Sequence, residues 1–232
     1  HWVERFQREA RTVARLQHQH IVQVYGTGIE EERPYLAMQY VPGGSLQDRL
    51  DALNAQSSLL TTAQTLNIAR ALLEALIVAH EAQVIHRDMK PGNVLIGKDG
   101  APVLTDLGIA AVGGWKTLTP AESVMGTPHY MAPEQILHRQ VDGRTDLYAL
   151  GIMMYEMFAG ARPIEAKSTG EMLHKQVHEE PQWLGNLRPD LAPGADTHLL
   201  ARRQHGAVVD ERALSNHQTS ARPRGEMDLR QK

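Results

Sequence analysis

Two long segments of this chain are apolar around most of a helical circumference. Residues 61–82 read TTAQTLNIARALLEALIVAHEA and residues 144–160 read RTDLYALGIMMYEMFAG, and both have the length of a helix rather than a strand. A helix without a wide polar face is stable only inside a protein, so both segments predict core helices. We expect Thr61 or Thr62 to cap the first helix and Asp146 to cap the second.

The start of the chain predicts a smaller region of mixed structure. Residues 4–16 have apolar side chains at helical spacing, and residues 21–25 and 35–41 have the composition of two β-strands. The acidic residues and the proline between these strands predict a polar turn. The sequence Gly-Thr-Gly at residues 26–28 fits a turn better than a phosphate-binding loop.

The remaining pattern completes an α+β fold with two lobes. Residues 45–53 predict a short helix capped by its first serine, and helical segments dominate from there on. We therefore expect a partial small β lobe over residues 1–41 and a mainly helical large lobe over residues 42–200. Residues 201–232 have few large apolar side chains and no sustained period, so we expect a divergent, disordered tail.

Composition argues against several classes of function. The net charge of −3 gives no electrostatic basis for nucleic acid as the main partner, and the lack of cysteine excludes disulfides and favours a cytoplasmic location. The longest apolar run, residues 147–155, is far shorter than the roughly 20 residues of a membrane helix, so we expect no membrane segment in this chain. Because the chain starts at His1 rather than methionine, we expect it to be cut from a longer protein, which a membrane could anchor elsewhere.

The segment VIHRDMKPGNVLI, residues 84–96, concentrates polar side chains between two apolar runs. Asp88 can accept a proton from a hydroxyl, Lys90 can neutralise a transferring phosphoryl group, and Asn93 can hold a metal ion. Asp106 follows in an Asp-Leu-Gly turn, and its carboxylate is a hard oxygen ligand of the kind that Mg²⁺ prefers. Together these four residues predict phosphoryl transfer.

Four motifs in a fixed order connect this chemistry with a family. The motifs are HRDMKPGN at residues 86–93, DLG at 106–108, GTPHYMAPE at 126–134 and DLYALG at 146–151. They resemble the catalytic domain of eukaryotic-type serine/threonine protein kinases, especially the bacterial ones, and the resemblance extends from residue 3 to about residue 200. It implies a protein-kinase-like bilobal fold, ATP and Mg²⁺ as cofactors, and a protein substrate with a Ser or Thr hydroxyl.

The resemblance also implies a role for each reactive residue. Asp88 would be the catalytic base that orients the substrate hydroxyl, and Lys90 would contact the γ-phosphate of the nucleotide. Asn93 and Asp106 would be the magnesium ligands, next to the bound nucleotide.

Further residues are assigned only through this resemblance. The nucleotide-binding residues would be Met38 behind the adenine, Gln39 to Val41 in the hinge, and Leu95 on the pocket floor. The residues with an implied structural role are Glu9, His86, Leu107, Thr127, Glu134 and Asp146. Arg87 would pair with a phosphorylated activation loop, whose candidate phosphorylation sites are Thr117, Thr119 and Ser123.

One family feature has no counterpart in the sequence. Family members carry a glycine-rich loop and a strand lysine before the helix of Glu9, and no lysine precedes Lys90 here. We therefore expect this chain to be an incomplete, weakly active or inactive fragment of a kinase. The alternative is a non-catalytic kinase-like module that acts by binding proteins. A small-molecule phosphotransferase fits less well, because such enzymes normally lack a segment like GTPHYMAPE.

Overall fold

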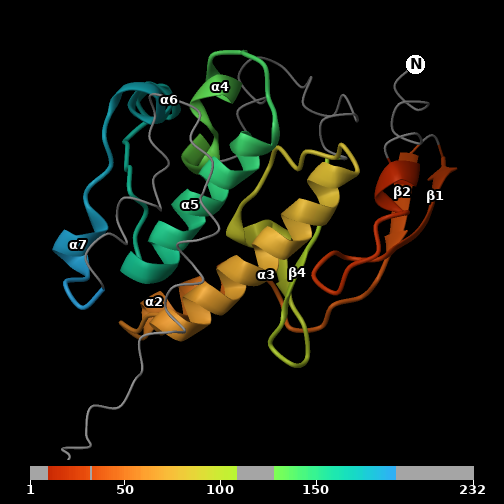
Figure 1. Ribbon diagram of the computed structural model, residues 1–232, viewed down its shortest axis with the longest axis horizontal. Coiled ribbons are helices and arrows are strands. Elements are labelled where there is room, and N and C mark those ends of the chain that lie inside the picture. Colours follow the sequence, from red (N-terminus) through yellow and green to blue (C-terminus); the bar gives the residue numbers. More distant parts are fainter. Residues whose placement is uncertain (1–9, 32, 109–127, 192–232) are drawn as a thin grey trace, which may run out of the picture.

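The computed structural model describes residues 10–31, 33–108 and 128–191 of the chain (Figure 1). In chain order its elements, with η for a 3₁₀ helix, are β1 (Val24–Glu30), β2 (Arg33–Met38), α2 (Leu46–Ala55), α3 (Thr62–Glu81), η1 (Pro91–Asn93), β3 (Val94–Ile96), β4 (Pro102–Leu104), η3 (Pro128–Tyr130), α4 (Pro133–Ile136), α5 (Gly143–Ala159), α6 (Thr169–His178) and α7 (Leu184–Leu187). Helix α3 crosses the middle of the molecule, with β1 and β2 on one side and α4 to α7 on the other (Figure 1). The predicted α+β architecture is confirmed.

The two predicted core helices are α3 and α5. Thr61 caps α3 in a capping box with Gln64, as one of the two expected alternatives. The expected cap of α5 is wrong: the cap is Asp142, whose carboxylate accepts the backbone N–H of Arg144. Helix α5 therefore begins before Asp146, which lies inside its first turn. The carboxylate of Asp146 is not used as the cap, so it can bind another segment. An aspartate at either position precedes the same apolar run, so the sequence pattern could not separate them.

The strand boundaries in the small lobe also differ from the prediction. The glycines at 26 and 28 lie within β1 and not in a turn, and β1 pairs with β2 in antiparallel register. A β-carbon on Gly28 would lie 2.3 Å from Cζ of Tyr35, so the ring of Tyr35 occupies the space that a side chain would fill. The register shifts between Val24 and Gly26, as expected of a bulge. Glycine inside this strand thus marks a close approach rather than a chain reversal.

The hairpin of β3 and β4 joins the two lobes. Its two strands pair around the turn at residues 98–100. The chain entering β1 attaches to one side, because Val22 N–H donates to the carbonyl of Leu104 at 2.8 Å. The chain leaving β2 attaches to the other side, because Gly43 N–H donates to the carbonyl of Ile96 at 2.9 Å. Both connections of the small lobe are therefore fixed to one hairpin.

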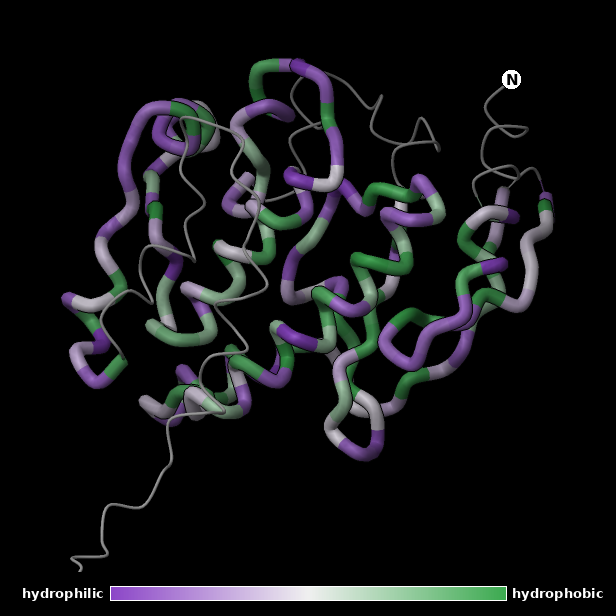
Figure 2. The backbone as a smooth tube through the Cα atoms, viewed as in Figure 1, coloured by the Kyte–Doolittle hydropathy of each residue, from purple (hydrophilic) through white to green (hydrophobic). Residues whose placement is uncertain are grey.

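One hydrophobic cluster extends through both lobes. Leu72 of α3, Met153 of α5 and Leu104 of β4 belong to it, and so do Val13 and Val24 of the small lobe. Hydrophobic segments accordingly follow α3 and α5 through the centre in Figure 2. Burying a side chain of this size stabilises the fold by about 1.5–3 kcal/mol, so the cluster holds the lobes together.

Parts of three predictions lie outside the described residues. Residues 10–13 are helical, as predicted, whereas residues 4–9 are outside the described part. The same holds for the predicted tail at 201–232 and for the end of the predicted large lobe, residues 192–200. Within the described residues, no helix combines the length and the apolar character that crossing a bilayer requires.

Candidate active site

The loop between α3 and β3 brings the three predicted catalytic side chains together. Lys90 Nζ donates to Asp88 Oδ2 at 2.7 Å. Asn93 Nδ2 donates to the backbone carbonyl of Asp88 at 2.7 Å and approaches its Oδ2 at 3.3 Å. Both donors therefore meet the same carboxylate oxygen. The second oxygen, Oδ1, has no hydrogen-bond partner among the described residues.

The backbone explains why a spacing of three residues brings Lys90 and Asn93 to one side. Pro91 begins the short 3₁₀ helix η1, where its fixed φ suits the first helical position. The turn closes with Asn93 N–H donating to the carbonyl of Lys90 at 3.0 Å. Lys90 is the extended residue before this helix, and the turn brings the backbone of Asn93 back to it. Asn93 itself is only 6% exposed, so its amide is held in one orientation.

Asp146 anchors this loop to α5. Its buried carboxylate accepts the backbone N–H groups of His86 at 2.9 Å and Arg87 at 2.8 Å. His80, at the end of α3, donates from Nε2 to the same carboxylate at 2.7 Å. Arg87 has a φ of +66°, a left-handed conformation that is uncommon for residues other than glycine. The hydrogen bonds to Asp146 stabilise this strained backbone directly before the proposed base.

His86 is buried and held in the neutral state. Its Nε2–H donates to the carbonyl of Thr105 at 2.8 Å, and its Nδ1 accepts the backbone N–H of Asp88 at 3.3 Å. This pair of contacts requires one proton on the ring and not two. Burial lowers the pKa of His86, and the carboxylates of Asp88 and Asp106 act in the opposite direction. The neutral ring thus joins the backbone of Asp88 to that of Thr105, the residue before Asp106.

The turn after β4 places Asp106 beside the loop. Thr105 N–H donates to the carbonyl of Asn93 at 3.0 Å, which fixes the start of the turn. Asp106 and Gly108 have φ angles of +60° and +62°, so the chain reverses sharply between them. As a result Leu107 points into the hydrophobic cluster and is fully buried, whereas Asp106 is exposed. The carboxylate is thus left available to a cation.

The hinge residues follow directly on β2. The hydroxyl of Thr105 donates to Sδ of Met38 at 3.6 Å, so Met38 lies against the residue that precedes Asp106. Gln39 N–H donates to the carbonyl of Gln23 at 2.8 Å. The backbone N–H of Val41 has no hydrogen-bond partner within residues 10–31, 33–108 and 128–191. The hinge therefore presents a backbone donor near the back of the predicted adenine pocket.

Leu95 packs against the hinge. It contacts a small hydrophobic cluster made by Val22, Val41 and Val103. The predicted pocket floor on β3 and the predicted hinge are therefore neighbours, although more than fifty positions separate them in the chain.

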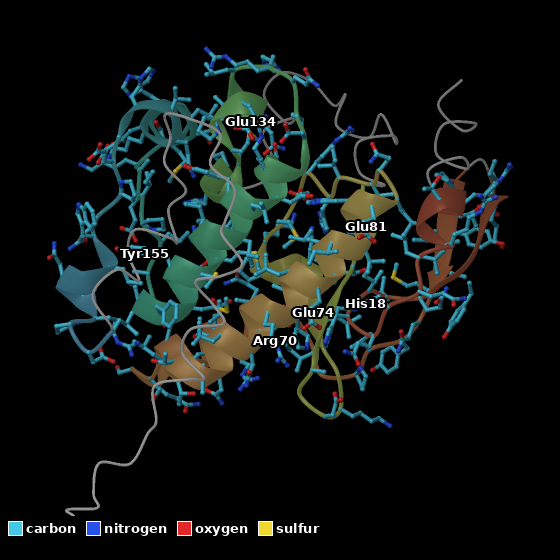
Figure 3. The ribbon with its side chains drawn as sticks, in the orientation of Figure 1. His18, Arg70, Glu74, Glu81, Glu134 and Tyr155 are labelled. Carbon is cyan, nitrogen blue, oxygen red and sulfur yellow. The ribbon has the colours of Figure 1, made fainter. Side chains whose placement is uncertain are left out.

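The GTPHYMAPE motif is attached to α5 through one partly buried and one buried contact. Thr145 Oγ1 donates to Glu134 Oε1 at 2.6 Å, at the place where Figure 3 labels Glu134. The hydroxyl of Tyr130 donates to the carboxylate of Glu156, and Arg162 Nε donates to the same carboxylate at 3.3 Å. Sequence reasoning did not find Glu156, although the signal was present: it is the one charged residue of α5 after Asp146.

One residue of α4, Gln135, was also missed. Gln135 Nε2 donates to the backbone carbonyl of Arg87 at 2.9 Å, and its Oε1 accepts the backbone N–H of Ala132 at 3.0 Å. Nothing in the sequence distinguishes this glutamine from an ordinary surface residue. Gln135 gains this partner only because α4 packs against the loop between α3 and β3, which is called the catalytic loop below.

The other predicted site residues lie outside the described part of the chain. They are Glu9, Thr117, Thr119, Ser123 and Thr127.

Comparison with known proteins gives a consistent result. The family model described as the protein kinase domain matches residues 1–196. The chain is 39% identical over 205 residues to the serine/threonine-protein kinase PksC of Streptomyces coelicolor, which covers 86% of this chain and 37% of that protein. It is 36% identical over 217 residues to the probable serine/threonine-protein kinase pknA2 of Bifidobacterium longum, covering 92% of this chain and 28% of that protein.

A third relative extends the comparison to another genus. The chain is 33% identical over 199 residues to the serine/threonine-protein kinase PrkC of Bacillus subtilis, which covers 86% of this chain and 30% of that protein. The chain thus spans about a third of the length of these curated relatives.

Proposed function

The chain belongs to the protein kinase domain family, and from this premise we propose that the protein containing it is an ATP-dependent protein serine/threonine kinase. It would transfer the γ-phosphoryl group of ATP to Ser or Thr hydroxyls of protein substrates. The observation that carries the proposal is the environment of Asp88, whose Oδ2 is bound by Lys90 and Asn93 while Oδ1 is left for a substrate.

Asp88 has the geometry of a catalytic base. The two donors on Oδ2 fix the carboxylate plane, so Oδ1 can accept the proton of a substrate hydroxyl in a defined direction. The hydroxyl oxygen then forms a bond to the γ-phosphorus while the bond between that phosphorus and the bridging oxygen of ADP breaks. The proton goes to Asp88, and ADP leaves with the electron pair of the broken bond.

Lys90 serves two neighbouring groups in this proposal. It is about one third exposed, so its ammonium can reach from Asp88 towards a phosphoryl group in the cleft. Its positive charge would orient the base and offset the negative charge on the transferring oxygens.

The residues present fit a magnesium ion. The carbonyl of Asp88 can only accept a hydrogen bond, so the amide nitrogen of Asn93 must face it and Oδ1 of Asn93 faces the other way. That oxygen and the exposed carboxylate of Asp106 are hard ligands suited to Mg²⁺. When bound, Mg²⁺ neutralises the charge of the nucleotide phosphates.

The proposed adenine site is the hinge. Val41 N–H is a backbone donor without a partner in the described part of the chain, which suits a ring nitrogen of adenine. Met38 would limit the depth of the pocket and Leu95 would contact one face of the base. Gln39 completes the hinge.

The regulatory assignments remain proposals of the same kind. Arg87 is exposed, and its guanidinium could pair with a phosphate on Thr117, Thr119 or Ser123. Glu9, Thr127 and Glu134 keep the structural roles that the family resemblance implies. We also propose that the protein acts in the cytoplasm, where ATP and Mg²⁺ are available.

The proposal is tested by Asp88→Asn in the complete protein. The asparagine keeps the size of the side chain but cannot accept a proton, so kcat should fall by a factor on the order of 10²–10⁴. The affinity for ATP, measured by calorimetry with Mg²⁺, should stay within a few-fold of the original value. Asp99→Asn, in the exposed β3–β4 turn, is the matched control and should leave kcat unchanged.

The alternative, a non-catalytic kinase-like binding module, makes the opposite prediction. In that case neither the unchanged protein nor the Asp99→Asn control transfers phosphate to a mixture of Ser- and Thr-containing peptides. Equal activity of the unchanged protein and Asp88→Asn would instead remove Asp88 from its assigned role.

A further inference from the structure

Three segments that are distant in sequence are joined pairwise by hydrogen bonds around the catalytic loop. The start of α4 is bound to the start of α5 through Thr145 Oγ1 and Glu134 Oε1, at 2.6 Å. The start of α5 is bound to the loop through Asp146, which accepts the N–H of Arg87 at 2.8 Å. The start of α4 is bound to the loop through Gln135, whose Nε2 donates to the carbonyl of Arg87 at 2.9 Å. Each of the three segments is therefore hydrogen-bonded to both of the others.

The peptide bond between Arg87 and Asp88 is fixed by contacts at both of its polar atoms. Its carbonyl oxygen accepts from Gln135 Nε2 at 2.9 Å, and its N–H donates to His86 Nδ1 at 3.3 Å. The preceding N–H, that of Arg87, is held by Asp146. A residue at a φ of +66° has a competing, less strained conformation available, so these contacts decide which conformation the chain adopts.

Gln135 makes the contact that comes from α4. It is the third residue of this helix, which begins at Pro133 within the GTPHYMAPE motif. Its Oε1 accepts the N–H of Ala132, so the side chain also caps its own helix. One amide therefore has two separable tasks: the oxygen holds α4, and the nitrogen holds the catalytic loop.

We propose that Gln135 is a positioning residue for the catalytic base. By donating to the Arg87 carbonyl, it fixes the peptide before Asp88 and so sets the direction of the carboxylate that receives the substrate proton. It also ties the orientation of the base to the position of α4. This role rests on the proposed kinase function, because it needs Asp88 to be the base.

The two tasks of Gln135 can be separated by three substitutions in the complete protein. Gln135→Glu keeps an oxygen for the Ala132 N–H but has no donor for the Arg87 carbonyl. Gln135→Lys keeps a donor long enough to reach that carbonyl but offers no acceptor to Ala132. Gln135→Met has a similar length and offers neither.

The catalytic rate should depend on whether the side chain at position 135 can donate a hydrogen bond to the carbonyl of Arg87. We expect kcat to fall about tenfold in Gln135→Glu and Gln135→Met, and to stay within about threefold in Gln135→Lys, because a single partly exposed hydrogen bond has a modest net effect. The KM for ATP should be unchanged in all three variants. The melting temperature should depend instead on whether that side chain has an oxygen to accept the N–H of Ala132. It should therefore be lower in the lysine and methionine variants than in the glutamate variant.

A purely structural role gives a different pattern. If kcat falls in parallel with the melting temperature, so that the glutamate variant is fully active and the lysine variant is impaired, the proposal is overturned. Unchanged kcat in all three variants overturns it as well.

A second readout does not depend on activity. Hydrogen exchange at the backbone amides of residues 86–88, measured by mass spectrometry, should be faster in the glutamate and methionine variants and unchanged in the lysine variant. If the unchanged protein transfers no phosphate, the proposed kinase function fails, and this exchange pattern still decides whether Gln135 holds the loop. Equal exchange in all variants would show that it does not.

Discussion

Arg87 and Asp146 are separated by 59 positions in the chain, and the carboxylate of Asp146 accepts the backbone N–H of Arg87 at 2.8 Å. The same carboxylate accepts the N–H of His86, so the loop before the proposed base is fixed to a buried helix. A motif that is local in sequence thus depends for its shape on a distant residue.

Asp146→Asn should destabilise the protein by about 1–3 kcal/mol, because the amide replaces one acceptor oxygen with a donor that faces a buried N–H. Urea unfolding measures the change. Asp142→Asn is the matched control on the same helix, and there asparagine remains a good N-cap, so we expect a loss below about 1 kcal/mol. Similar losses at both positions would contradict the anchoring role of Asp146.

Gly43→Ala should destabilise the connection between the lobes. The added β-carbon would lie 2.3 Å from the carbonyl oxygen of Ile96, and a backbone atom cannot move aside as a flexible side chain can. We expect a loss of about 1–3 kcal/mol in urea unfolding and weaker ATP binding. Gly26→Ala is the control, since nothing lies within 4 Å of a β-carbon there, and its stability should change by less than about 0.5 kcal/mol. If both variants unfold at the same urea concentration, the close approach at Gly43 has no effect on stability.

Tyr130→Phe should destabilise the protein by about 1–3 kcal/mol, because it leaves the buried carboxylate of Glu156 with one donor fewer. Burial raises the pKa of Tyr130, and the carboxylate of Glu156 raises it further, so the hydroxyl stays a donor well into the alkaline range. Tyr40→Phe, at a tyrosine that is 85% exposed, should have no measurable effect.

A double-mutant cycle separates the Tyr130 contact from general packing. Combined with Glu156→Gln, the loss from Tyr130→Phe should become smaller than in the original protein. Strictly additive losses would mean that the two side chains do not interact.

Stability should fall in acid through His86. Because burial lowers the pKa of His86 below its ordinary value of 6.5, the unfolded chain binds this proton more readily than the folded one. The free energy of unfolding is therefore unaffected above pH 6.5 and decreases as the pH falls from 6.5 towards the lower pKa of the folded state, by up to about 1.4 kcal/mol per pH unit.

NMR titration of the histidine rings checks this assignment residue by residue. The His86 ring should remain neutral, with its proton on Nε2, at a pH where an exposed histidine is charged. The pKa of His129 should also lie below the ordinary histidine value, because burial and the charge of Arg162 both lower it. A His86 ring that titrates at or above 6.5 would contradict the buried, neutral state.

Several elements could be predicted because their causes are local. Pro91 starts a 3₁₀ turn, and the hydrogen bond from Asn93 N–H to the carbonyl of Lys90 brings these two residues together within four positions. The capping boxes of α2 and α3 are likewise made within four residues. The apolar composition of α3 and α5 is enough to require burial of most of their apolar side chains, although α3 keeps one water-exposed side with Arg70 and Glu74.

The errors have a common physical origin in contacts between distant segments. The boundaries of β1 depend on the ring of Tyr35, which occupies the space above Gly28 and allows a glycine-rich stretch to remain a strand. Asp146 was expected to be a cap, and its side chain is instead directed to the catalytic loop. In both cases the pattern within ten residues permits two conformations, and the partner that selects one of them is elsewhere in the chain.

The sequence by itself determined which residues form the candidate site and which helices have a buried face, because residue type, short-range spacing and apolar periodicity act over one or two turns of chain. The tertiary structure alone decided which backbone groups hold those residues in place: Asp146 on the Arg87 N–H and Gln135 on the Arg87 carbonyl. A hydrogen bond between such distant positions forms only when packing brings donor and acceptor within about 3 Å, and that packing is a property of the whole fold.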